Sequence, residues 1–282
     1  MLPSKFLLVA VTWCSFFIPA IASAQQADEQ APASQLRVLS YNIHHGEGVD
    51  GKLDLERIAR VIKSVKPDLV ALQEVDQKVK RSQDVDQPAE LARLTEMKVA
   101  FGGNLALQGG EYGNAILSRF PIKMHKNHLL PNLEKGEQRG VLQAEIELPN
   151  RKRPLVCLAT HFDHRQNDAE RLESAKAINT LVDRLGDQCA ILAGDLNDVH
   201  KSKAVVELQE NWTLTNEAPQ PTIPVERPTR QIDFVLFRPA SRWKVVEVKV
   251  LDEAVASDHR AILAVLELTS AVGNTGGAKP QP

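Results

Sequence analysis

The sequence predicts an α/β fold in which two mixed β-sheets pack against each other and helices lie outside them. Three observations lead to this class. Strand-like apolar runs outnumber helical stripes, their polar and apolar residues alternate in a mixed way, and two β-α-β units follow each other along the chain. No linker interrupts residues 36–268, so we expect a single domain over that range.

The first β-α-β unit opens the domain. The segment "LRVLSYNI" has the apolar character of a buried strand, and "DLVALQE" is the next strand. Between them Asp54 is a candidate N-cap, and Lys66-Pro67 is expected to stop the helix. The apolar residues that recur at helical spacing are Leu55, Ile58, Ile62 and Val65.

The second unit lies in the middle of the chain. Its strands are "PLVCLATHF" and "CAILAGD", and the helix between them is expected to end at Gly186. The stripe of this helix is Leu172, Ala175, Ile178, Val182 and Leu185. Shorter strands, "NAILSR" and "GVLQAEIEL", precede the unit, and "QIDFVLF", "WKVVEVKV" and "RAILAVLEL" follow it.

The ends of the chain predict export and disorder. Residues 1–24 have the form of a signal peptide, with Lys5 before an apolar run from Phe6 to Ala20 and an A-x-A site at residues 22–24. This run is shorter than the ~20 residues of a spanning helix, and no other stretch is apolar enough to cross a bilayer. We therefore expect a secreted or periplasmic protein, with disordered segments at 25–35 and 269–282.

The charge balance bears on possible partners. The chain has 34 basic and 36 acidic side chains, and removal of residues 1–24, whose only charge is Lys5, gives a formal charge of −3. A surface for long nucleic acid usually shows as basic excess, so that partner is disfavoured, although a local basic groove stays open. Export would permit a disulfide between Cys157 and Cys189, but we expect two buried thiols. We also expect the protein to be a monomer.

Polar residues collect at the ends of the apolar strands. Each has an ordinary explanation as a turn or surface residue, but ligands of α/β proteins gather at strand ends, so the set is more informative than its members. Carboxylates, amides and imidazoles without a cysteine cluster suit a hard cation such as Mg²⁺. The set is Asn42, Glu74, His161, Asp195, Asn197, Asp233, Asp258 and His259.

Two histidine spacings leave zinc as an alternative. These are His125-x-x-His128 and His161-x-x-His164, and the first pair lies among lysines in a polar strand, which indicates solvated surface. A further pair of neighbours, Asp258 and His259, occurs in "SDHRA". Because successive side chains of extended backbone point to opposite sides, we predict that these two do not serve each other and need separate partners.

Seven segments of the chain resemble, in the same order, the endonuclease/exonuclease/phosphatase superfamily. They are "LSYNIHHG", "ALQEVD", "YGNAILSRFPI", "THFDH", "ILAGDLND", "QIDFVLF" and "SDHRA". That group includes DNase I-like nucleases, abasic-site endonucleases, neutral sphingomyelinases and inositol-phosphate phosphatases. The resemblance runs from about Leu36 to Leu268, and the "HHG" and "HFDH" variants resemble an exported bacterial branch of metal-dependent hydrolases.

The resemblance implies a DNase I-like four-layer α/β sandwich and metal-assisted attack of water on a phosphate ester. It implies Glu74 as the principal Mg²⁺ ligand, with Asn42 and Asp258 completing the site, and leaves Mn²⁺ or Ca²⁺ possible. It also implies that Asp195 and Asn197 orient water and phosphate, and that His161 donates to a phosphoryl oxygen. His259 would contact the phosphate or move a proton, held by Asp233, and either Asp195 or His259 would be the general base.

Other residues are expected around the substrate. Asn114 and Arg139 are predicted to face the phosphate, and a rim of polar side chains would shape the leaving-group pocket. That rim is His44, His45, Asp163, His164 and Arg230. The sequence thus predicts a secreted Mg²⁺-dependent phosphoesterase for a small or lipid-derived substrate. Alternatives are a secreted DNase I-like nuclease, disfavoured by the acidic balance and few aromatic residues, and a non-catalytic binding module, which predicts gaps in the polar set.

Overall fold

The computed structural model describes residues 35–269, so the predictions for residues 1–34 and 270–282 lie outside the described residues. Gln35, expected to end the N-terminal linker, is the first residue of strand β1. No helix within residues 35–269 has the length and apolar character needed to cross a membrane.

The described strands form two six-stranded mixed sheets. In the first sheet only β1 and β2 are parallel to each other, and in the second only β7 and β8 are. In spatial order the first sheet is β11 (Trp243–Val250), β12 (Ile262–Leu268), β1 (Gln35–Asn42), β2 (Leu69–Gln77), β4 (Gly110–Ser118) and β3 (Lys98–Leu107). The second is β5 (Ile122–Leu129), β6 (Gly140–Ile146), β7 (Leu155–His161), β8 (Ala190–Asp195), β10 (Asp233–Arg238) and β9 (Thr213–Leu214).

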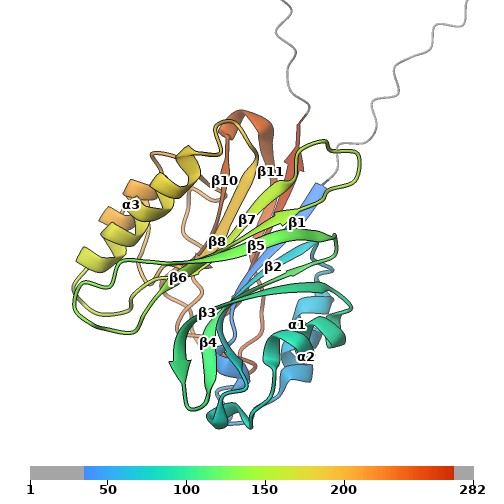
Figure 1. Cartoon of the computed structure of the whole chain (residues 1–282), viewed down its shortest axis with the longest axis vertical. Coiled ribbons are helices and arrows are strands. Elements are labelled where there is room, and N and C mark those ends of the chain that lie inside the picture. The colour runs from blue at the N-terminus through green and yellow to red at the C-terminus, as the bar shows by residue number, and fades with distance from the viewer. Residues whose placement is uncertain (1–34, 270–282) are drawn as a thin grey trace, which may run out of the picture. The chain divides into compact units, whose positions relative to one another are not determined.

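Three apolar layers hold four layers of secondary structure together. The central layer lies between the sheets, where alternate residues of facing strands interdigitate, among them Ala71, Cys157 and Ala264. One outer layer joins the first sheet to α1 (Leu55–Ser64) and α2 (Gln87–Thr95), and the other joins the second sheet to α3 (Ala169–Asp183) and α4 (Lys203–Leu208). Figure 1 shows α1 and α2 on one side of the sheets and α3 on the other. The predicted four-layer sandwich is confirmed.

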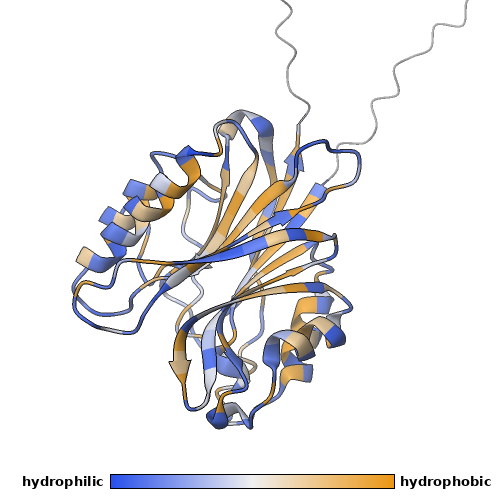
Figure 2. Cartoon of the chain, viewed as in Figure 1, coloured by the Kyte–Doolittle hydropathy of each residue, from blue (hydrophilic) through white to orange (hydrophobic). Residues whose placement is uncertain are grey.

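Side-chain chemistry explains where the two crossover helices begin and end. The carboxylate of Asp54 accepts a hydrogen bond from the Arg57 amide at 2.8 Å, so the predicted N-cap of α1 is confirmed. The apolar faces of the helices turn toward the strands while their polar faces point outward (Figure 2). Helix α3 ends at Asp183, three residues before the expected Gly186, which instead sits in the following turn with φ of 56°.

Several elements had no clear signal in the sequence. Helices α2 and α4 and strands β3 and β9 were not predicted; β3 contains Gly102-Gly103, which breaks the usual strand pattern. The two described cysteines are free thiols as expected, although Cys189 is only half-buried. His125 is exposed on β5 while His128 is partly buried, so only the first matches the predicted solvated surface.

Candidate active site

One cavity of about 390 Å³ collects most of the polar strand-end residues. Both sheets contribute to its walls. The predicted site residues that line it are Glu74, Arg139, His161, His164, Asp195, Asn197, Asp258 and His259. Asn42, Asp233 and Asn114 are fully buried and support the walls rather than line them. Of the predicted rim, His44 lines the cavity, whereas His45, Asp163 and Arg230 do not.

An irregularity of β2 directs the side chain of Glu74 into the cavity. The pairing of β2 with β4 shifts register between Leu72 and Val75, and Glu74 has φ of 57°. This left-handed backbone is unfavourable for a residue with a Cβ, and such strain clusters where a side chain serves a site. A β-bulge redirects a side chain in this way. The carboxylate of Glu74 therefore reaches the cavity from a strand whose neighbouring residues are buried.

Asn42 joins the two sheets at the end of β1. Its Nδ2 donates to Oε1 of Glu74 at 2.9 Å and to Oδ2 of Asp195 at 3.1 Å. Its Oδ1 accepts from the backbone amide of His44 at 3.0 Å. Asn42 thereby holds two carboxylates near each other, and its predicted role as a metal ligand stays a prediction.

The second sheet contributes three ionisable side chains at regular strand positions. His161 at the end of β7 is the register partner of Asp195 at the end of β8, and Asp195 is the register partner of Asp233 at the start of β10. Register partners lie on the same face of a sheet, so the three side chains gather without special backbone geometry. Gly194 allows this approach, because a Cβ there would collide with the carbonyl of Thr160.

His259 is paired with Asp233, as predicted. Its Nδ1 donates to Oδ2 of Asp233 at 2.9 Å, and its Nε2 lies 3.7 Å from Oδ2 of Asp195. Burial opposes the charge on this ring, but the carboxylates of Asp233 and Asp195 outweigh burial and raise the pKa of His259 to about 10. His259 is therefore an imidazolium at neutral pH.

The backbone around Asp258 and His259 differs from the expected one. Both residues lie in the loop before β12, not in extended strand backbone, so strand alternation does not separate their side chains. The pair joins the two sheets, because Asp233 starts β10 of the second sheet and His259 precedes β12 of the first. The loop is fixed instead by Ser257, whose hydroxyl donates to the carbonyl of Asn42 at 2.8 Å and accepts from the His259 amide at 3.2 Å.

Burial dominates the protonation of Asp195 and His161. It raises the pKa of Asp195 to about 7, with His259 opposing and Asp233 adding to the rise. Burial, together with the positive charge of Arg139, lowers the pKa of His161 well below its usual value. Asp195 is thus poised to exchange a proton near neutral pH, while His161 is a neutral imidazole.

The tautomer of His161 follows from its neighbours. Arg139, which is always a donor, contacts Nδ1 at 3.0 Å, so Nδ1 accepts and the proton is on Nε2. Nε2 lies 3.5 Å from Oδ2 of Asp195. Nδ2 of Asn197 also lies 3.0 Å from Nε2 and donates to the carbonyl of Phe162 at 3.0 Å. The predicted phosphate contact of Asn197 stays a prediction.

Arg139 is held between two histidines. Its second terminal nitrogen lies 3.2 Å from Nδ1 of His164, and the side chain is almost fully buried. Asn114 donates to the carbonyl of Gly140, the first residue of β6 and the neighbour of Arg139, at 3.0 Å. Because Asn114 does not line the cavity, we interpret it as a residue that positions the start of β6 beside Arg139.

Five further residues line the cavity although no sequence motif marked them. They are Arg81, Glu137, Leu105, Leu107 and Tyr112. Arg81 makes two hydrogen bonds to the buried carboxylate of Asp76, at 2.8 and 2.9 Å, and lies over the Tyr112 ring. Arg81 sits in a polar loop and the leucines in an unpredicted strand, so no motif marked them.

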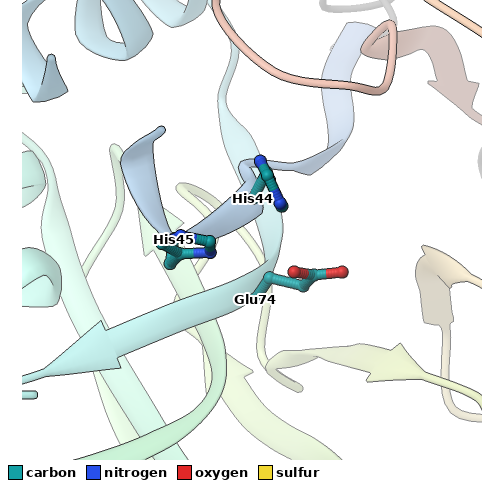
Figure 3. A group of neighbouring side chains, drawn as sticks. All are labelled: His44, His45 and Glu74. Atoms are coloured by element: carbon teal, nitrogen blue, oxygen red, sulfur yellow. The ribbon is translucent and has the colours of Figure 1, made fainter. Parts of the chain in front are cut away.

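Two groups of described side chains have metal-ligand spacing. One is Asp195, Asp233 and His259, where the imidazole and carboxylates already neutralise one another. The other is His44, His45 and Glu74, which converge beside the cavity (Figure 3). Glu74 uses only Oε1 in hydrogen bonds to described residues, and the exposed Asp258 also lines the cavity. These oxygen donors fit a divalent cation such as Mg²⁺ that keeps several waters.

Known proteins resemble the chain over nearly the whole described range. The model of the endonuclease/exonuclease/phosphatase family matches residues 39–259. The uncharacterised protein YbhP of Escherichia coli K12 is 27% identical over 255 residues, which cover 85% of this chain and 99% of YbhP. An endonuclease/exonuclease/phosphatase structure from Beutenbergia cavernae is 28% identical, with a TM-score of 0.72 over 84% of this chain and 72% of that one.

A more distant structure shares the fold. The mannosyl-6-phosphatase Bt3783 of Bacteroides thetaiotaomicron is 18% identical and has a TM-score of 0.69, covering 82% of this chain and 99% of its own. Family members are generally phosphoester hydrolases that depend on a divalent metal. The family model matches most of the described residues, and the acidic and histidine side chains of the motifs gather in one cavity. The chain therefore belongs to the endonuclease/exonuclease/phosphatase family.

Proposed function

We propose that the protein is a Mg²⁺-dependent phosphoesterase that hydrolyses a small or lipid-derived phosphate ester. The observation that carries this proposal is the link through Asn42, which places the cavity-facing Glu74 beside Asp195 and the Asp233–His259 pair. That arrangement puts a site for a cation next to a proton-exchanging carboxylate and a fixed positive charge. Phosphoryl transfer needs those groups, because its transition state spreads negative charge over phosphate oxygens.

The chain's own residues have separable tasks in this reaction. Glu74, Asn42 and Asp258 would hold Mg²⁺, which when bound polarises the phosphate ester and neutralises its charge. Asp195, with its pKa near 7, would accept the proton of the attacking water. The imidazolium of His259 would donate a hydrogen bond to a phosphate oxygen, and Asp233 would keep it charged. Arg139, which also lines the cavity, would add a second positive charge.

The cavity supports a compact substrate. Its volume of about 390 Å³ falls in the range of small-molecule sites, and its apolar wall of Leu105 and Leu107 would contact a non-phosphate portion. That the similarly folded Bt3783 is a mannosyl-6-phosphatase supports a phosphomonoester of small size as one candidate. The excess of acidic over basic side chains disfavours long nucleic acid.

A substrate panel tests the proposal. Purified protein with Mg²⁺ would be assayed against bis-aryl phosphate, sugar phosphates, inositol phosphates, sphingomyelin and plasmid DNA, with EDTA as the control. We expect metal-dependent release of phosphate or alcohol from a small ester, and weak DNA binding with a shallow salt dependence. Rapid plasmid cleavage with a steep salt dependence would establish a nuclease instead. Full activity in EDTA would refute the metal-dependent mechanism.

We also propose that the protein is exported, because residues 1–24 have the three regions of a signal peptide. Fractionation of cells that express the full chain would test this. Mature protein lacking residues 1–24 should be found outside the cytoplasm, and replacing Ala22 and Ala24 by bulky residues should block cleavage. Recovery of the uncleaved chain in the cytoplasm would contradict export.

A further inference from the structure

The turn that follows β1 carries two histidines beside Glu74. His44 and His45 belong to the short 3-10 turn His44–Gly46, and each offers a ring nitrogen within 4.8 Å of the other and of a Glu74 oxygen. Figure 3 shows the side chains of His44, His45 and Glu74 as close neighbours. They come from two separate segments, so this convergence is a product of the tertiary fold.

Each imidazole has one nitrogen near Glu47 and one that makes no hydrogen bond to any residue in the range 35–269. Nδ1 of His44 lies 3.1 Å from the carbonyl of Glu47, which can only accept, so the proton is on Nδ1 and Nε2 has a free lone pair. Nε2 of His45 lies 3.6 Å from the carboxylate of Glu47, while Nδ1 of His45 is buried with no hydrogen-bond partner. Metal-binding histidines are oriented in this way, with the second nitrogen donating to a carbonyl or carboxylate.

The backbone of the turn is strained and is held in place from outside. His44 and His45 both have φ of 44°, in the left-handed region that residues with a Cβ avoid. Gln87 of α2 fixes the turn by donating to the carbonyl of His45 at 2.6 Å while accepting from the Asp76 amide at 3.0 Å. Gly46 completes it at φ of 82°, where a Cβ would press on Leu55. Asparagine or glycine would form this turn more easily, so the imidazoles serve something other than the turn.

We propose that His44, His45 and Glu74 form a binding site for a divalent first-row transition metal, exemplified by Zn²⁺, Co²⁺ or Mn²⁺. Two imidazole nitrogens and one carboxylate oxygen are a ligand set for such ions, whereas Mg²⁺ and Ca²⁺ take oxygen ligands. The site overlaps the oxygen site of Glu74, Asn42 and Asp258 at Glu74 and differs from it in the two imidazole ligands. The inference rests on the proposed function only through Glu74, which the two sites share.

Cobalt provides a direct probe, because imidazole ligation changes its visible absorption. Untagged, metal-free protein would be titrated with Co²⁺, and bound Co²⁺ then displaced by other ions. We expect Zn²⁺ to displace Co²⁺ readily and Mn²⁺ to bind more weakly than Co²⁺. Mg²⁺ or Ca²⁺ should displace Co²⁺ only at concentrations far above that of Co²⁺, because these ions compete for Glu74 but do not favour imidazole ligands. The absorption should report nitrogen ligands even if no substrate is ever hydrolysed.

Single substitutions assign the ligands. His44→Asn and His45→Asn should each weaken Co²⁺ binding by about 100-fold or more, since asparagine tolerates the left-handed backbone but removes the imidazole. Glu47→Gln, which alters only the partner of His45, should weaken it by roughly 10-fold. His125→Asn is the matched control, because His125 is an exposed histidine on β5, and it should bind Co²⁺ like the original protein. Circular dichroism would confirm that each variant is folded.

The results separate this inference from the proposed function. If His44→Asn and His45→Asn bind Co²⁺ as the original protein does, the transition-metal site is wrong, whatever the hydrolytic activity. If Co²⁺ binding depends on both histidines but no phosphate ester is hydrolysed with any metal, the site stands and the proposed function fails. If Mg²⁺ displaces Co²⁺ from the folded protein at similar concentration, the proposed selectivity is wrong.

Discussion

The two sheets share one strand plan but supply the cavity with different kinds of residue. Each sheet has a central parallel pair, β1–β2 or β7–β8, flanked on both sides by antiparallel strands and joined by α1 or α3. The first sheet offers Glu74 and His44 from left-handed backbone, with lone pairs free of protein partners. The second offers His161, Asp195 and Asp233 from regular strand positions, all buried.

The difference shows how one architecture can divide two tasks. Free lone pairs on a strained backbone suit the binding of a cation or substrate, because the ligand supplies the missing interactions. Buried groups that have fixed, charged or hydrogen-bonded neighbours suit the placement of charge, because burial and those neighbours shift their pKa values. Substitutions in the two sheets should therefore produce different defects, and four predictions follow in order of expected effect.

The largest effect is expected in the first sheet. Glu74→Gln should lower turnover by about 10⁴-fold or more, since a bound metal supplies several kcal/mol of transition-state stabilisation. The fold should be retained, because Glu74 is only partly buried. Steady-state kinetics and calorimetric Mg²⁺ titration would measure the two quantities. Normal turnover of this variant would show that Glu74 has no part in the reaction. The proposed division between cation binding by the first sheet and charge placement by the second would then be wrong.

The matching change in the second sheet is Asp233→Asn. It should lower turnover by an acid–base increment on the order of 10²–10⁴-fold, with Mg²⁺ affinity nearly unchanged. Because the Asp233 carboxylate contributes to the high pKa of His259, its loss should move the alkaline limb of the pH–rate profile to lower pH. A profile over pH 5–11 would detect this shift. An unmoved alkaline limb would show that His259 does not act as a charged group.

Asp258 lies in the loop that connects β11 to β12 within the first sheet, and its substitution tests which task that loop serves. Asp258→Asn should raise the Mg²⁺ concentration for half-maximal activity by roughly 10-fold and leave the alkaline limb in place. Activity measured across a Mg²⁺ series at several pH values would separate the effects. If this variant moves the pH limb while Asp233→Asn weakens Mg²⁺ binding, the two roles are reversed.

The smallest effect concerns the two crossover helices. Asp54→Ala should lower the free energy of unfolding by ~1 kcal/mol, because its carboxylate caps α1. Asp168 occupies the same position on α3 but makes no capping bond, so Asp168→Ala should change stability by less than ~0.5 kcal/mol. Urea denaturation of both variants gives the comparison directly. Equal losses would mean that the capping bond of Asp54 contributes nothing of its own.

Much of the fold could be read from the sequence because its signals were local. Apolar periodicity located both β-α-β units, and the position of Asp54 before the first helical stripe marked a cap. Strand β3 was not predicted because its consecutive glycines obscure the strand pattern. Without that strand, Leu105 and Leu107 could not be predicted to line the cavity. The terminal helical turn of α3 was misplaced because a glycine beyond the helix was taken for its end.

The sequence predicted which residues form the site better than it predicted how those residues contact one another. Motif order identified Glu74, Asp195 and His259 and implied the pairing of His259 with Asp233, but the separation of Asp258 from His259 was predicted from strand backbone where the structure has a loop. The use of Asn42 as a link between carboxylates depends on a contact across 153 positions, which no local pattern encodes. The strained turn at His44 and His45 also escaped, since a backbone angle leaves no mark on composition.

The pairing of β1 with β12 has a consequence for when the protein can act. β1 is the first described strand and β12 the last, yet they are hydrogen-bonded neighbours, and Ser257 bonds the carbonyl of Asn42 across 215 positions. During synthesis β1 therefore cannot pair with β12 until the C-terminal part of the chain has been made. Contacts between residues so far apart in sequence slow folding. A nascent or C-terminally truncated chain has no complete cavity. The cavity can therefore form only after the segment from Ser257 through β12 has been synthesised.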